Sequence, residues 1–261
     1  MMSDGDQKVP AAAHVEGGRE PFLSIVTATY NSVSTVRDTL ESVRKQTFQD
    51  FEHIVVDGGS TDGTIDVLKE YGPAIRWISE PDRGIYDAMN KGIAMSRGHW
   101  IHLLNSDDFY ASNDVLGRIV PKLLPNALNY ADLIRLNADG SRFSQSYRYR
   151  KWPLYLSAFL PHPSLLVSAE QYRLAGLYDA SFRIAADHDL ILRLLDRYPP
   201  NHIEVEMTVM RQSGVSATNL DLTMDEFGRV LRKHNVPIIL IELVMGIRRI
   251  WWKMRSYKRS N

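Results

Sequence analysis

Two adjacent carboxylates, Asp107 and Asp108, follow an apolar run that ends at Leu104. Neighbouring carboxylates repel each other unless a cation or solvent compensates their charge. Oxygen-rich sites of this kind suit Mg²⁺ or Mn²⁺, which keep several waters and bridge to the phosphates of a substrate. Capping of the next helix is the simpler function of such residues, but Ser112 can supply that cap without them. The pair therefore predicts a divalent-cation site.

Polar residues also follow three other apolar runs in this half of the chain. The four clusters occupy residues 27–31, 57–60, 80–84 and 105–108. Any one of them could simply cap a helix, because Asp, Ser and Asn are common at helix N-termini. In open α/β sheets, however, ligands bind outside the carboxyl ends of the strands. Four such clusters at one sheet edge therefore favour a polar ligand.

A parallel sheet would bring these clusters to one edge. Short apolar runs predict buried strands over 22–28, 51–57, 75–79 and 100–104. Apolar residues at helical spacing predict helices over 33–46, after 63 and over 85–96. Strands that alternate with helices in this rhythm predict a doubly wound, mostly parallel α/β sheet with helices on both faces.

The pattern changes after about residue 125. Apolar or alternating stretches predict strands over 131–137, 142–149, 165–167 and 203–209. A strong helix begins at or beside Asp187 and turns Leu190, Leu194 and Leu195 toward a core. We expect this second half to be mixed structure built onto the same sheet.

Composition excludes several classes of protein. The chain has 261 residues, of which 44% are hydrophobic, so it can bury a core and is not disordered as a whole. Because it has no cysteine, it has no disulfides, cysteine-ligated zinc, iron–sulfur clusters or thiol nucleophile. Its 31 Lys and Arg residues balance 31 Asp and Glu residues, which argues against a nucleic-acid partner.

The four motifs resemble those of glycosyltransferase family 2, the inverting glycosyltransferases with the A-type fold. The matching stretches are Ser24–Asn31, Val55–Thr64, Ser79–Gly92 and Leu103–Asp108. The resemblance implies a Rossmann-like sheet and the transfer of a sugar from a nucleoside diphosphate to an acceptor hydroxyl. The sequences of the second and third motifs resemble those of the subgroup found in bacterial polysaccharide and glycolipid assembly.

The same resemblance implies roles for individual residues. Those expected to bind the nucleotide-sugar donor are Thr27, Tyr30, Asp57, Arg83, Asn90, Asn105 and Ser106. Asp107 is the expected metal ligand, and Asp108 is expected to help it. The sequence departs from the commoner family wording at two positions, where Gly58 and Asn105 replace aspartates.

The resemblance continues over the acceptor half, between about 161 and 217. Asp187 looks like the catalytic base, although Ala186 replaces the usual preceding glutamate. A carboxylate within hydrogen-bond reach would accept the proton of the attacking hydroxyl, and a cation would stabilise the leaving diphosphate. Asp187 could instead cap its helix, and Asp189 remains a rival for the base. His162 and Arg211 are possible contacts of the acceptor or the phosphates.

The C-terminal residues 229–261 are strongly basic. They contain nine Lys and Arg residues and one acidic residue, Glu242, so the rest of the chain is acidic on balance. Trp251, Trp252 and an aliphatic run over 236–247 accompany these charges, a combination typical of a helix at a membrane interface. Packing of this helix on the domain is the alternative. We expect the segment to dock on the cytoplasmic leaflet, where a lipid-linked acceptor would be presented.

The predicted organisation has four segments. Residues 1–20 are expected to form a flexible tail without the apolar core of a signal peptide. The nucleotide-sugar-binding half covers 21–125, the acceptor-binding half covers 126–228, and the basic segment covers 229–261. We expect a cytoplasmic enzyme, peripheral on the inner face of the membrane. A non-catalytic nucleotide-sugar-binding module is one alternative. A sugar-phosphate nucleotidyltransferase is another, but it would need a glycine-rich basic loop that 27–32 lacks.

Overall fold

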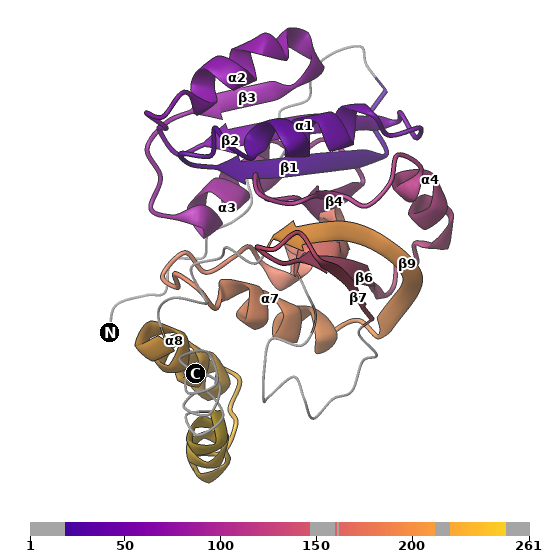
Figure 1. Ribbon diagram of the computed structural model, residues 1–261. Helices are drawn as coiled ribbons and strands as arrows, with labels where there is room; N and C mark the ends of the chain where they lie inside the picture. Colours follow the sequence, from indigo (N-terminus) through magenta and orange to yellow (C-terminus); the bar gives the residue numbers. More distant parts are fainter. Residues whose placement is uncertain (1–18, 147–159, 161, 212–219, 249–261) are drawn as a thin grey trace.

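Strands and helices alternate along the first half of the chain, as the sequence predicts. The computed structural model describes residues 19–146, 160, 162–211 and 220–248 (Figure 1). The strands are β1 (Leu23–Thr29), β2 (Phe51–Asp57), β3 (Arg76–Ser79) and β4 (Trp100–Leu103), and the helices are α1 (Val36–Arg44), α2 (Thr64–Glu70), η1 (Gly72–Ala74) and α3 (Ile85–Met95). β1 pairs in parallel with β2 and β4, and β2 pairs in parallel with β3.

Helices cover both faces of this sheet because side chains alternate along each strand. Val55 packs among apolar residues of α1 and α2, whereas Val26 and Val56 pack with those of α3. Gly92 lets α3 lie directly on β1, since a Cβ atom there would come within 2.2 Å of a Val26 methyl group. The close approach therefore packs α3 tightly on β1.

The second half is mixed, as predicted. Its elements are β5 (Phe109–Tyr110), α4 (Val115–Ile119), η2 (Val120–Lys122), β6 (Leu128–Leu136), β7 (Arg142–Gln145), η3 (His162–Ser164), β8 (Leu165–Ser168), α6 (Ala169–Ala175), α7 (Ala186–Leu195) and β9 (Pro200–Arg211). β8 joins the two halves by pairing antiparallel with both β4 and β6. Across the described residues the strand order is β3-β2-β1-β4-β8-β6-β9-β5, with β7 beside β6.

Several boundaries differ from the predictions. β9 extends the predicted strand by three residues before 203 and two after 209, and part of the predicted strand over 142–149 lies outside the described residues. The short strand β5 and the helix α6 were not predicted. β5 has only two residues, too few to show a period, and α6 is held by a capping box at Ser168 and Gln171 rather than by a long apolar face.

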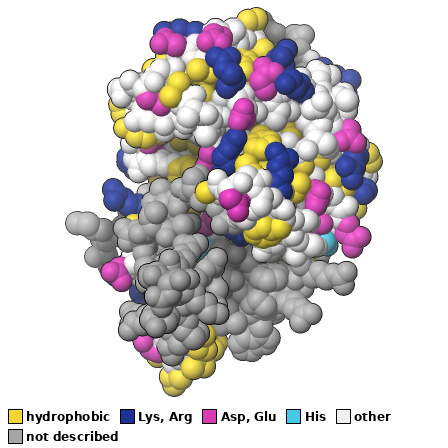
Figure 2. Space-filling model, in the orientation of Figure 1, with side chains coloured by type: hydrophobic (Ala, Val, Ile, Leu, Met, Phe, Trp, Pro, Cys, Tyr) yellow, Lys and Arg dark blue, Asp and Glu magenta, His cyan; other side chains and the backbone are white. Residues whose placement is uncertain are grey.

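The last described residues form a pair of helices that we call the C-terminal hairpin, consisting of α8 (Leu220–Lys233) and a helix over 238–248. Phe227 and Leu231 of α8 pack against Ile241 and Val244 of the second helix. The hairpin lies beside α7 (Figure 1), and hydrophobic side chains gather at its far end, at the bottom of the view in Figure 2. The boundary predicted between 228 and 229 falls inside α8, so the basic segment does not begin as a separate unit.

Candidate active site

A cleft of about 880 Å³ opens at the carboxyl ends of β1 and β4, beside the first turns of α3 and α7. Both halves of the chain contribute to it, because β8 and η3 bring the second half against β4. The predicted site residues on its walls are Tyr30, Arg83, Asn105, Ser106, Asp107, His162 and Asp187. The structure thus brings together residues that are up to 157 positions apart in the sequence.

The two adjacent carboxylates point in different directions. Asp107 lies on the cleft wall, whereas Asp108 is only 2% exposed and accepts a hydrogen bond from the backbone N–H of Arg211 at 3.3 Å. Burial, with the neighbouring charge of Asp107, raises the pKa of Asp108 well above its ordinary value. Of these two carboxylates, the geometry therefore offers only Asp107 to a cation in the cleft and gives Asp108 a place in the protein interior.

Arg211 supports this loop from outside the cleft. It is the last residue of β9, and its guanidinium donates to the carbonyl oxygen of Asp107 at 2.7 Å. The same guanidinium lies over the ring of Phe109, 4.9 Å from the centroid. Arg211 was predicted as a possible contact of the acceptor or the phosphates. The structure instead makes it a strand residue that braces the Asp107 backbone, and 212–216 lie outside the described residues.

Asp187, His162 and Asn105 form a connected row along the cleft. His162 Nδ1 lies 3.4 Å from Asp187 Oδ2, and His162 Nε2 lies 3.1 Å from Asn105 Nδ2. Asp187 Oδ1 also accepts the backbone N–H of His188 at 2.8 Å. Burial acts to raise the pKa of Asp187, but the hydrogen bonds and charges of His162 and His188 together outweigh it and hold that pKa below its ordinary value. Asp187 is therefore an ionised carboxylate that faces the cleft.

Asp189, the rival for the base, faces the opposite side of α7. Successive helix residues are rotated by about 100°, so two positions along the helix turn the side chain away from the cleft. The buried carboxylate of Asp189 instead accepts from Arg193 Nε at 3.0 Å, His234 Nε2 at 3.0 Å and Lys233 Nζ at 3.2 Å. These contacts give Asp189 a structural place between α7 and the C-terminal hairpin.

Thr27, Asp57 and Asn90 also lie away from the cleft walls. Thr27 is buried with its Oγ1 atom 3.0 Å from His53 Nε2. Asp57 accepts hydrogen bonds from the Gly59 and Ser60 N–H groups and from Ser79 Oγ, so it shapes its own loop. Asn90 donates to the carbonyl oxygen of Tyr178 at 2.8 Å and accepts from its N–H at 3.0 Å. Each of these three side chains is engaged within the protein.

Gly58 lies close to two side chains at the rim of the cleft near β2. A Cβ atom at Gly58 would lie 2.5 Å from Asp82 Oδ2 and 3.3 Å from the ring of Tyr30. A larger residue at this position would require the Asp82 side chain to shift. Tyr30 itself is 62% exposed, and Arg83 is exposed and paired with Asp87 at 2.8 Å, so both side chains are accessible from the cleft.

Comparison with known proteins identifies the chain. Residues 24–175 match the family model described as Glycosyl transferase family 2. The chain belongs to this glycosyltransferase family. A Mycobacterium tuberculosis protein named PGL/p-HBAD biosynthesis glycosyltransferase is 31% identical over 180 residues, which cover 66% of this chain and 69% of that relative.

Two further comparisons extend the similarity. The Escherichia coli chondroitin synthase is 29% identical over 227 residues, which cover 82% of this glycosyltransferase but 33% of the synthase. A solved mannosyltransferase, PcManGT from Pyrobaculum calidifontis in complex with GDP-Man and Mn²⁺, has a TM-score of 0.65 at 16% identity and covers 89% of this chain and 72% of its own. The predicted family, the A-type α/β fold and the glycosyltransferase activity are confirmed.

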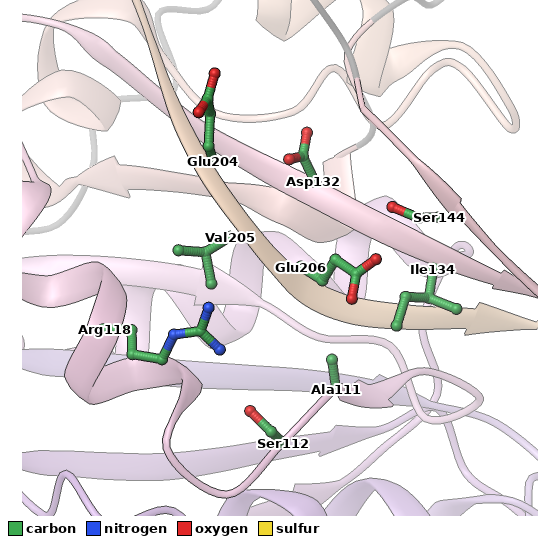
Figure 3. A pocket seen from close by; sticks show the side chains of 9 residues that line it. All are labelled: Ala111, Ser112, Arg118, Asp132, Ile134, Ser144, Glu204, Val205 and Glu206. Atoms are coloured by element: carbon green, nitrogen blue, oxygen red, sulfur yellow. The ribbon is translucent and has the colours of Figure 1, made fainter.

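A second hollow of about 430 Å³ lies between α4, β6 and β9 (Figure 3). Glu204 and Glu206 of β9 and Arg118 of α4 contribute to its walls, together with Asp132, which lies 2.7 Å from His202 Nε2. It shares no wall residue with the cleft and contains none of the predicted site residues. In the part of the chain that the structure describes, no three His, Cys, Asp or Glu side chains converge as a metal-binding group.

Sequence reasoning did not single out two residues that shape the cleft. Tyr86 lies within the third motif, and its hydroxyl donates to the carbonyl oxygen of Ile184 at 2.6 Å, next to Asp187 at 3.4 Å. Glu226 of α8 is buried against the same segment. The motif could have pointed to Tyr86, whereas no local pattern marks Glu226 as different from other helix residues.

Proposed function

We propose that this glycosyltransferase moves a sugar from a nucleoside diphosphate to an acceptor hydroxyl with inversion, using Asp187 as the base and a divalent cation at Asp107. The observation that carries the proposal is that Asp107 and Asp187, from different halves of the chain, lie on the walls of one cleft. In this assignment residues 21–125 supply most of the donor site and 126–228 the acceptor side, while 229–261 form the basic segment and 1–20 a tail.

Asp187 suits the role of base because its environment keeps it ionised. The hydroxyl of an acceptor has a pKa far above neutral, so its proton must pass to a nearby group as the oxygen attacks the anomeric carbon. The pKa of Asp187 is lowered, and its Oδ2 is held by His162. A carboxylate on the side of the sugar opposite the diphosphate favours attack from that side, which inverts the anomeric centre.

The donor site and the cation can share the Asp107 end of the cleft. The buried Oδ1 atom of Asn105 has no hydrogen-bond partner among the described groups, and Asp107 lines the same cleft. Mg²⁺ and Mn²⁺ are often held by one or two carboxylates together with substrate phosphates and water, so these residues fit such an ion. When bound, the cation would absorb the negative charge that develops on the leaving nucleoside diphosphate. Tyr30 and Arg83 would contact the nucleotide.

The acceptor belongs to polysaccharide or glycolipid assembly in this proposal. The names of the M. tuberculosis relative and of chondroitin synthase support that setting, and the GDP-Man complex of the mannosyltransferase supports a nucleotide-sugar donor. The outer face of the helix over 238–248 supports attachment to a bilayer surface, because Ile238, Ile239, Leu243 and Ile247 are exposed there, Ile239 by 82%. In the described part of the chain no helix is long and apolar enough to span a bilayer.

The basic residues of 229–261 complement an anionic leaflet, where each Lys or Arg contributes about 1 kcal/mol. Co-sedimentation with anionic and neutral vesicles tests this surface. A variant with Ile239 and Leu243 changed to serine is a better comparison than a chain that ends at 228, because such a truncation would cut α8. Equal binding of wild type and variant to anionic vesicles would contradict the membrane assignment.

A thermal-shift panel tests the reaction class. UDP-, GDP- and dTDP-sugars are added with and without Mn²⁺, and we expect at least one donor to raise the melting temperature more when the metal is present. Asp107→Asn should remove the metal-dependent part of the shift, whereas Asp187→Asn should keep it and lose turnover. The absence of any metal-dependent stabilisation would count against the cation, and full turnover by Asp187→Asn would remove the base assignment.

A further inference from the structure

Glu226 is a buried carboxylate that serves backbone groups at the edge of the cleft. It belongs to α8, it is 1% exposed, and it lies 39 residues beyond Asp187 in the sequence. Its Oε1 atom accepts the N–H of Arg183 at 2.7 Å, and its Oε2 atom accepts those of Ile184 at 2.7 Å and Ala185 at 3.1 Å. A buried carboxylate is unfavourable unless its oxygens are hydrogen-bonded, and here both are.

The three N–H groups belong to consecutive residues and form an anion-binding nest. The residues on its cleft side, Arg183 and Ile184, are walls of the cleft, and α7 begins immediately after Ala185. Ala185 is the N-cap of α7 and offers no side-chain cap, and the Glu226 carboxylate places its acceptor oxygens at the N–H groups that lead into this helix. Asp187 lies in that first turn.

The same segment is held from its other side by Tyr86. The Tyr86 hydroxyl donates to the carbonyl oxygen of Ile184 at 2.6 Å, and the Tyr86 ring is buried and stacked on Tyr178 at 5.4 Å. The backbone at 184 is therefore fixed through its N–H by the C-terminal hairpin and through its carbonyl by α3. A change in either contact would move the residues that lead into Asp187.

Other contacts tie α7 to the hairpin along its length. The ring of His188 stacks on that of Phe227 at 4.4 Å. Farther along, Asp189 accepts hydrogen bonds from Lys233 and His234 at the end of α8. The hairpin thus packs directly on the helix that carries the proposed base.

We propose that Glu226 is a positioning residue for catalysis, which makes the C-terminal hairpin a part of the active site. Its carboxylate fills the nest at 183–185 and thereby sets the acceptor side of the cleft and the orientation of Asp187. The proposal rests on the function proposed above, in which Asp187 is the base. It also means that the hairpin whose second helix is proposed to meet the bilayer holds the first turn of the catalytic helix.

Chemical rescue tests the proposal. Glu226→Ala leaves the nest empty, and we expect kcat to fall at least tenfold while the affinity for the nucleotide, measured by calorimetry, changes less than twofold. Formate or acetate can occupy the vacated nest and should restore kcat, whereas acetamide should not. Glu226→Gln keeps the shape of the side chain and one oxygen acceptor, so it should lose less kcat than Glu226→Ala. Its kcat should still be below that of wild type, because its amide nitrogen is a donor that faces an N–H group.

Two matched controls separate positioning from general packing. Asp225→Ala removes a negative charge from an exposed neighbouring position of α8 and should leave kcat unchanged. Leu231→Ala loosens the buried contact between the two helices of the hairpin and should lower the melting temperature without any response to formate. Amide hydrogen exchange at 183–185 should be faster in Glu226→Ala and slower again when formate is added.

The outcomes are distinct from those of the reaction assay. A wild-type protein with no turnover for any donor would refute the proposed function, whereas an active wild type with unchanged kcat in Glu226→Ala would overturn the positioning role alone. A loss of kcat that formate does not reverse, together with unchanged amide hydrogen exchange at 183–185, would assign Glu226 to packing and would also overturn the positioning role.

Discussion

Replacing Asp189 with asparagine separates a structural carboxylate from a catalytic one only two residues away. The Asp189 carboxylate is fully buried and accepts hydrogen bonds from Arg193, Lys233 and His234 at 3.0 to 3.2 Å. Burial acts to raise its pKa, but the bond from His234 and the charges of Arg193 and Lys233 outweigh burial and lower the pKa from 3.8 to about 2. Asparagine has nearly the same shape but carries no charge.

The magnitude follows from linkage between protonation and folding. One pKa unit corresponds to about 1.4 kcal/mol, so the lowering of the Asp189 pKa corresponds to roughly 2 kcal/mol of stability. Since the folded pKa lies below the unfolded one, this stability is fully present above pH 4 and is lost as the pH falls toward 2. The variant also leaves three donors without a carboxylate, so we expect Asp189→Asn to lower the free energy of unfolding by about 3 kcal/mol at pH 7.

Urea unfolding at pH 7 and at several values between 4 and 2.5 measures this difference. We expect the gap between wild type and Asp189→Asn to narrow as the pH falls, while kcat of the folded variant at pH 7 stays within tenfold of wild type. A gap that is constant across this pH range would refute the electrostatic reasoning. Loss of turnover by a hundredfold or more in a stably folded Asp189→Asn protein would instead make Asp189 the base.

Three further predictions use the same protein. Asp187→Asn should lower kcat by about 10²- to 10⁴-fold, the usual contribution of a general base, and calorimetry should find the nucleotide affinity unchanged. A kcat within tenfold of wild type would contradict the role of Asp187 as the base. His162→Gln removes a contact that lowers the pKa of Asp187, so the acid limb of the pH–rate profile should move to higher pH. A limb that stays in place or moves to lower pH would contradict the effect of His162 on this pKa. Gly92→Ala places a methyl group 2.2 Å from a Val26 methyl carbon, and this overpacking should destabilise the fold by about 1–3 kcal/mol. The higher helix propensity of alanine offsets part of that loss. Adding Val26→Ala to it should recover part of that loss in thermal unfolding, and additive losses would show that the two residues do not compete for space.

The elements of the first half were predictable because local pattern and tertiary environment agree there. The strand over 51–57 has the same bounds in the prediction and in the structure, since an apolar run flanked by turns is buried on both faces of a parallel sheet. The second half is built from short pieces, and the two-residue strand β5 exists only through its pairing with β9. Such an element has no periodicity of its own from which to be predicted.

Motifs identified the residue types of the site more reliably than their orientation. Thr27 belongs to the first motif, but strand alternation turns it to the face opposite Ala28, which lines the cleft. Asp57 and Asn90 belong to motifs as well, yet they bond the backbone of neighbouring segments. A sequence motif can therefore preserve the architecture around a ligand as well as the contacts with it. The role of Glu226 could not be predicted, because its partners at 183–185 become neighbours only through the packing of α8 on α7.

The divergence of Asp107 and Asp108 changes the electrostatic interpretation of their loop. If both carboxylates faced the cleft, two negative charges would repel the diphosphate of a donor unless the cation were already bound. Burial instead keeps the Asp108 carboxylate out of the cleft and leaves Asp107 on the wall. One carboxylate beside the neutral amide of Asn105 repels a diphosphate less than two carboxylates would, while still offering an oxygen ligand to Mg²⁺ or Mn²⁺. The asparagine that replaces the first aspartate of the family motif acts in the same direction, so both features reduce the negative charge that an incoming donor meets.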